Sequence, residues 1–79
     1  MNNELGTKVY RKLLYFFENK LPIHFDLCNG GWKNGEILDL SEKKLTLVLR
    51  EFKEGELPFL LEDINCDSIK LFREKEDGA

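Results

Sequence analysis

The chain has 79 residues, of which 42% are hydrophobic and 34% are charged, and its formal net charge is −3. A chain of this length forms one domain, and its apolar content excludes a disordered chain, which has too little apolar surface to bury. No apolar run approaches the roughly 18 residues that a membrane span needs, and charges interrupt any signal-peptide core at the N-terminus. We therefore expect one soluble, cytoplasmic domain over residues 1–79, without membrane contact.

The charge is unevenly distributed along the chain. Residues 1–20 hold four basic and two acidic side chains and have a net charge of +2, whereas residues 21–79 have a net charge of −5. An acidic surface repels a phosphate backbone, so any contact with nucleic acid must use local basic patches.

Residues 4–19 predict an amphipathic helix. Apolar side chains recur there at spacings of four, four and three, as the helical period requires, at Leu5, Val9, Leu13 and Phe16. Gly6 costs about 1 kcal/mol relative to alanine within a helix, so the helix could instead begin at Thr7. Pro22 prevents the helix from continuing.

After Pro22 the apolar period changes from 3.6 to 2, which predicts strands. The segment 23–28 alternates apolar and polar residues, and Asn29-Gly30-Gly31 is a turn signal, because glycine supplies positive φ. A second strand is expected from Trp32 to about Leu40, with Gly35 marking a bulge or bend.

The rest of the chain alternates between turns and strands. The expected order is a turn at 41–43, a strand at 45–50, a charged turn at 51–56, a strand at 58–61, a tight turn at 63–67, a strand at 68–73 and a mobile tail at 74–79. The sequence thus predicts a mainly β fold, in which an N-terminal helix precedes a five-stranded small barrel over residues 22–73.

The string LCNGGWKNG (Leu27–Gly35) resembles the first half of the Sm motif of Sm, LSm and bacterial Hfq proteins. The longer run LPIHFDLCNGGWKNGEI (Leu21–Ile37) is similar to the strand pair of Hfq, which likewise follows an N-terminal helix. The segment FLLEDINCDSI (Phe59–Ile69) stands where the second motif of that family belongs. The chain is therefore identified as a divergent Sm-like, SH3-like small barrel.

This resemblance implies a ring-forming, RNA-binding homo-oligomer in which the fourth strand of one subunit pairs with the fifth strand of the next. It also implies that the first and fifth strands are antiparallel neighbours. The chain departs from the family at the positions that hold a base. Ser41 stands where an Asp is common, the family's Asn falls near Leu45 or Thr46, and Glu62-Asp63 replaces Arg-Gly or Lys-His.

Three groups of residues are candidates for binding nucleic acid. Lys8, Arg11 and Lys12 share the polar side of the helix, where they could bind phosphates or form a solvated face. Ser41, Lys43 and Lys44 occupy the loop where the family binds RNA, although turn residues need no function. Trp32 beside Lys33 and Asn34 could stack on a base or pack in the core or against another subunit.

The remaining polar residues favour no chemistry. Glu62 and Asp63 are strand neighbours that would point apart, so we expect solvation rather than acid–base catalysis. His24 is the only histidine and has no ligand set around it. Cys28 and Cys66 could meet, but we expect two free thiols. We expect no enzyme activity, no metal and no cofactor.

Two functions remain open. The first is an oligomeric Sm-like RNA-binding or RNA-chaperone protein whose ligand is single-stranded RNA of unknown sequence. The alternative is an Sm-like barrel that acts as a protein–protein adaptor and has lost RNA recognition, which Ser41 and the acidic pair at 62–63 motivate.

Overall fold

The protein is mainly β, with one N-terminal helix and a five-stranded antiparallel sheet. The structure is a computed structural model that describes residues 3–73. In chain order the elements are α1 (Asn3–Glu18), β1 (Ile23–Asp26), β2 (Trp32–Ser41), β3 (Thr46–Glu51), β4 (Gly55–Leu60), the 3₁₀ turns η1 (Leu61–Asp63) and η2 (Cys66–Ser68), and β5 (Lys70–Leu71). The tail at 74–79, which we expected to be mobile, lies outside the described residues.

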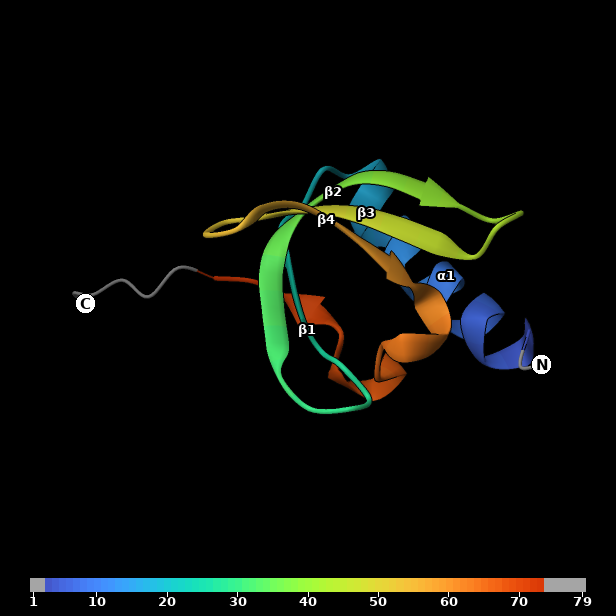
Figure 1. The fold of residues 1–79 in the computed structure, drawn as a ribbon. Helices are drawn as coiled ribbons and strands as arrows, with labels where there is room; N and C mark the ends of the chain where they lie inside the picture. The colour runs from blue at the N-terminus through green and yellow to red at the C-terminus, as the bar shows by residue number, and fades with distance from the viewer. Residues whose placement is uncertain (1–2, 74–79) are drawn as a thin grey trace.

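The strands follow the order β4-β3-β2-β1-β5, and every neighbouring pair is antiparallel. β1 and β5 are therefore neighbours, as the sequence resemblance implied. β4 and β5 are the two edges of the sheet and do not pair with each other, so the sheet is open. Figure 1 shows that it is strongly curved, because β2 bends along its length and carries the chain from β1 toward β3.

The core lies between the concave side of the sheet, α1 and the two 3₁₀ turns. The helix contributes one stripe, and each strand contributes its alternate residues, as the apolar periods of 3.6 and 2 predict. The buried apolar residues are Val9, Leu13, Ile23, Phe25, Leu40, Leu47, Leu49, Leu61, Ile64 and Ile69.

The first turn of α1 includes Gly6, so the expectation that the helix could begin at Thr7 is wrong. Gly6 is buried, and a Cβ atom added to it would lie 2.9 Å from Cδ1 of Leu45. The helix tolerates the glycine because its missing side chain lets the β2–β3 turn pack closely against the helix. This contact offsets the low helix propensity.

At Gly35, where the sequence predicted a bulge or bend, the backbone of β2 lies close against that of β3. An added Cβ atom would overlap the carbonyl oxygen of Arg50 and would lie 2.9 Å from the Cα atom of Glu51. The register between β2 and β3 also shifts between Ile37 and Asp39, which marks a bulge. A close backbone approach and a bulge together let the sheet curve around its core.

The last third of the chain differs most from the prediction. β4 begins at Gly55 rather than Pro58, because the carboxylate of Glu51 closes a tight turn and lets pairing start at once. Residues 63–67 do not form a single turn, since Asp63 ends η1 and Cys66 begins η2. β5 has two residues rather than six, because Ser68 belongs to η2.

Replacing Gly35 with alanine tests the close approach between β2 and β3. We expect a loss of about 1–3 kcal/mol in the free energy of unfolding, as for an overpacked core. Urea denaturation with a circular dichroism readout measures it. Glu36→Ala, one residue along the same strand, removes an exposed ion pair with Arg50 and should cost at most about 1 kcal/mol. Equal stability of the two variants would contradict the role of Gly35.

Candidate nucleic-acid interface

A polar and aromatic cluster covers the convex face of β1, β2 and β5. Ile23 and Phe25 point into the core, so the alternating residues His24 and Asp26 point outward. On β2, Asn34 lies opposite His24, and Trp32 lies opposite Asp26. We call these four residues the outer-face cluster.

The hairpin between β1 and β2 places Trp32 in this cluster. Gly30 and Gly31 adopt positive φ values of 105° and 86°, which residues with side chains rarely adopt. The turn is closed by hydrogen bonds from the N–H of Leu27 to the carbonyl oxygen of Gly31 and from the N–H of Gly30 to that of Leu27. The predicted turn is confirmed, and it sets the register that pairs Trp32 with Asp26.

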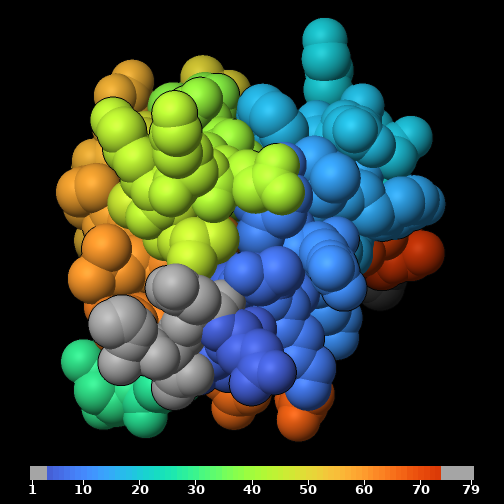
Figure 2. All heavy atoms as spheres, turned by 90° about the vertical axis from the view of Figure 1, so that its right-hand side faces the viewer, coloured from blue at the N-terminus to red at the C-terminus, as the bar shows by residue number. Residues whose placement is uncertain are grey.

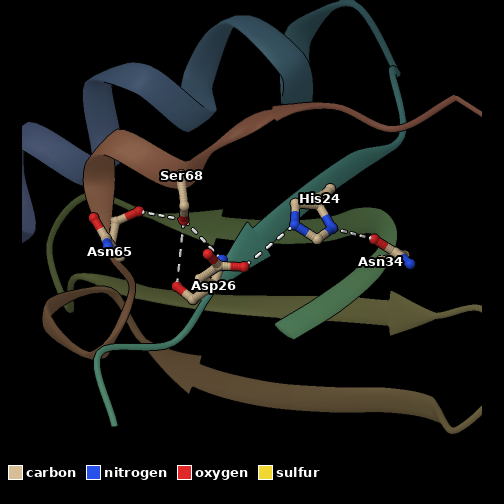
Figure 3. Close-up of polar contacts among 5 residues, drawn as sticks. All are labelled: His24, Asp26, Asn34, Asn65 and Ser68. Atoms are coloured by element: carbon tan, nitrogen blue, oxygen red, sulfur yellow. Dashed lines mark hydrogen bonds and ion pairs between the residues drawn. The ribbon is translucent and has the colours of Figure 1, made fainter. Parts of the chain in front are cut away.

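Polar contacts hold three residues of the cluster, His24, Asp26 and Asn34, in one arrangement (Figure 3). The Nδ1 atom of His24 lies 2.7 Å from Oδ1 of Asn34, and its Nε2 atom lies 3.3 Å from Oδ1 of Asp26. The backbone N–H of Asp26 donates to Oγ of Ser68 at 2.7 Å, which links β1 to η2. The imidazole is therefore oriented from two sides, and its ring centroid lies 6.0 Å from that of Trp32.

An open depression of about 440 Å³ lies beside this cluster. It is lined by His24, Trp32 and Asn34 together with the β5 segment Lys70, Leu71, Phe72 and Arg73. The Trp32 side chain is 55% exposed, which is unusual for so large an apolar surface. An exposed aromatic face, an amide and two cations form a surface that can stack on a base and attract its phosphate.

Glu51, at the end of β3 and opposite Gly35 of β2, stabilises the turn that follows it. Its carboxylate is 6% exposed and accepts the N–H groups of Lys53 and Glu54, each at 2.8 Å. Burial raises the pKa of this carboxyl, but the backbone N–H groups and the charge of Lys33 outweigh burial, so the pKa is lowered. The turn that Glu51 closes also donates the N–H of Phe52 to the carbonyl oxygen of Asn34.

The basic residues of the helix form a separate surface. Lys8, Arg11 and Lys12 are exposed on α1, as predicted. The Nζ atom of Lys12 donates to the carbonyl oxygen of Cys66 at 3.2 Å, so it also ties the helix to η2. Tyr15 is 61% exposed one turn beyond Arg11. This helix face combines cations with an aromatic ring.

The predicted loop site lies beside the N-terminal half of the helix. Ser41 ends β2 instead of starting the turn, and its Oγ atom accepts the N–H of Lys44 at 3.0 Å. Leu45, expected to begin a strand, completes the turn with a φ of 54°. Figure 2 shows the yellow-green β2–β3 turn against the blue start of the helix. Lys44 shares a small hollow of about 130 Å³ with Glu62, which weakens the local positive charge.

The structure does not bring all predicted residues together. Trp32 begins β2 and Ser41 ends it, and the loop after Ser41 lies beside Gly6 of the helix rather than beside Trp32. Sequence reasoning set His24 aside and missed Lys70 and Arg73. Alternation along the first hairpin could have placed His24 and Asn34 beside Trp32. The two β5 cations join them only because β5 pairs with β1.

The remaining sequence candidates give no further site. Cys28 and Cys66 are both free thiols. Within residues 3–73, no three His, Cys, Asp or Glu side chains are grouped as metal ligands would be. In this same part of the chain, no helix has the length and apolar character needed to cross a membrane. The acidic residues Glu62 and Asp63 are exposed on η1.

Comparisons with known protein families, with curated proteins and with solved structures gave no match to this chain. The site therefore has to be interpreted from its own residues.

Glu51→Gln tests the buried carboxylate behind the outer-face cluster. Its pKa is lowered from the usual 4.5, so its contribution is complete above the unfolded-state pKa and is lost as the pH falls through the folded-state pKa. We expect the variant to lose about 1–3 kcal/mol of unfolding free energy at neutral pH. This deficit should shrink on acidification below pH 4.5, as urea titrations across this range would measure.

Glu56→Gln, at an exposed position on β4, is the matched control. It should change the unfolding free energy by less than about 0.5 kcal/mol at every pH. A deficit in Glu51→Gln that persists unchanged in acid would contradict a structural role for the ionised carboxylate.

Proposed function

We propose that this protein is an oligomeric, Sm-like RNA-binding protein of the RNA-chaperone kind, located in the cytoplasm. In this proposal, single-stranded RNA binds to the outer-face cluster. The observation that carries it is Trp32, 55% exposed beside an ordered histidine and next to a depression rimmed by Lys70 and Arg73. Base stacking on an exposed aromatic ring, with cations for the phosphates, is how single strands are commonly held.

The strand arrangement supports the Sm-like part of the proposal. A helix followed by five strands, an Asn-Gly-Gly turn and an antiparallel β1–β5 pair are what the sequence resemblance implied. Within residues 3–73, β4 and β5 are the two edges of the sheet, and they are the strands through which that resemblance implies subunit contact. An unpaired edge is also a physical reason for self-association.

The helix face is the second RNA contact that we propose. Lys8 and Arg11 are exposed there, and Lys12 lies beside them. Phosphate contacts attract RNA without regard to sequence, whereas stacking on Trp32 needs an unpaired base. The two surfaces together would bind an unpaired strand in preference to a duplex.

One observation favours the alternative, a protein–protein adaptor. A hollow of about 460 Å³ lies between the end of α1 and the middle of β2. Its apolar lining is formed by Phe16, Phe17, Leu21, Ile37 and Leu38. For an adaptor, short polyU and polyA oligonucleotides should fail to bind at low salt while a protein partner co-purifies.

Trp32→Ala tests the stacking contact. Stacking on an aromatic ring contributes about 1–3 kcal/mol per base, so affinity for a short single-stranded RNA should fall about 5- to 150-fold. Fluorescence anisotropy of labelled RNA measures it. Trp32 is the only tryptophan, so its own emission should also change when RNA binds to the unmodified protein.

Trp32→Phe keeps an aromatic face and should retain most of the affinity. Leu38→Ala, which removes an exposed apolar side chain on another part of β2, should leave binding unchanged. If Trp32→Ala binds RNA like the unmodified protein and the emission of Trp32 does not respond to RNA, the outer-face cluster is not the site.

Charge reversal on the helix tests the phosphate contacts. The triple variant Lys8→Glu, Arg11→Glu, Lys12→Glu should abolish RNA binding. Because Lys12 also bonds to η2, the double variant Lys8→Glu, Arg11→Glu should be measured beside it. The slope of log affinity against log salt should become shallower by about 0.7 for each phosphate that the variant no longer neutralises. Lys20→Glu is the control, and unchanged affinity in the triple variant would refute the helix assignment.

A further inference from the structure

The free edge of β4 has a gap in its row of backbone donors. The N–H of Leu61 donates to the carbonyl oxygen of Leu45, which continues the β3–β4 ladder. Since hydrogen-bonded and non-hydrogen-bonded pairs alternate in an antiparallel ladder, Glu56, Pro58 and Leu60 direct their backbone groups to the open edge. Pro58 has no N–H. This edge therefore offers three carbonyl oxygens but only the N–H groups of Glu56 and Leu60.

The free edge of β5 is centred on Leu71. The N–H of Phe72 donates to the carbonyl oxygen of Pro22, and His24 pairs with Lys70. By the same alternation, Leu71 lies in a non-hydrogen-bonded pair with Ile23, so its N–H and C=O point away from β1. Leu71 therefore needs a partner residue that supplies both a donor and an acceptor.

We infer that Leu71 of one copy of this chain pairs with Leu60 of a second copy in an antiparallel ladder. This inference rests on the proposed self-association and adds the register of the contact. Leu71 cannot pair with Pro58, because its carbonyl oxygen would then face a residue with no N–H. Only Glu56 and Leu60 remain as partners on β4.

Two features favour Leu60 over Glu56. Leu60 and Leu71 are 49% and 37% exposed, and pairing them covers two apolar side chains with each other. In this register the missing donor of Pro58 faces Arg73, which is exposed and can bond to water. If Leu71 were opposite Glu56 instead, Pro58 would lie opposite Ile69, and the carbonyl oxygen of Ile69 would face a residue with no N–H. Ile69 is only 4% exposed, so water could not readily replace that donor.

An opposite-charge contact is available in this register, although it does not separate the two, since Arg73 lies diagonal to Glu56 in either one. With Leu71 opposite Leu60, Arg73 lies opposite Pro58 and diagonal to Glu56, within reach of a long side chain. Such a contact joins different surfaces of two identical chains, since β4 of one meets β5 of the next. Repeated, it builds a ring if the rotation closes and a filament if it does not.

Paired cysteines test this register. In a background with Cys28→Ser and Cys66→Ser, the double variant Leu60→Cys, Leu71→Cys is oxidised mildly with no RNA present. Cα atoms in a hydrogen-bonded pair lie about 5.5 Å apart, which a disulfide can span. β4 and β5 are at opposite edges of one sheet, and only a bond between copies raises the mass on a gel. We expect a ladder of covalent multimers on a non-reducing gel.

Each single cysteine variant should give no ladder, because one position does not meet itself in this contact. The matched control Glu56→Cys, Leu71→Cys should also lack the ladder. A ladder from the Glu56 pair in place of the Leu60 pair overturns the register, while light scattering that still shows multimers leaves the proposed assembly standing. A protein that scatters as a monomer and gives no ladder overturns both.

Discussion

The structure depends on how closely β2 can approach β3 at Gly35. Because Gly35 has no side chain to collide with the backbone of Arg50, the two paired strands lie close together there, and a bulge follows between Ile37 and Asp39. Curvature lets the alternate residues of β1 and β3 meet around Phe25, which is fully buried. The same curvature leaves β1, β2 and β5 with a convex outer face. The outward-facing side chains of these strands do not help to fill the core, so they are available to form the candidate site.

Polar contacts between distant parts of the chain then order that face. Ser68 accepts the N–H of Asp26, and Asp26 in turn lies beside His24, which also contacts Asn34. Glu51 contributes through the turn that it closes, in which the N–H of Phe52 donates a hydrogen bond to the carbonyl oxygen of Asn34. The imidazole next to Trp32 is thus positioned by residues from β1, β2 and η2. A preordered surface loses less conformational entropy when it binds a ligand.

The sequence predicted the parts of the fold that short-range patterns determine. The helical stripe and the 29–31 turn each follow from residues close together in the chain, whereas the bulge lies between Ile37 and Asp39 rather than at Gly35. Glu51 misled the prediction, because a buried carboxylate bonded to backbone N–H groups looks like part of a charged loop in sequence. Lys70 and Arg73 could not be assigned to Trp32 from sequence, because only the β1–β5 pairing brings them to the same depression.

The acidic balance of the chain does not argue against binding RNA at this face. Several carboxylates have partners within the protein: Glu36 pairs with Arg50, Glu54 with Lys33 and Asp26 with His24. None of these ion pairs, which are those found within residues 3–73, uses Lys70 or Arg73. Charges beyond about 10 Å are largely screened at moderate salt, so a phosphate at the depression responds mainly to the cations beside it. In the proposed complex, net charge would affect how fast RNA approaches, whereas these nearby groups would determine whether it stays bound.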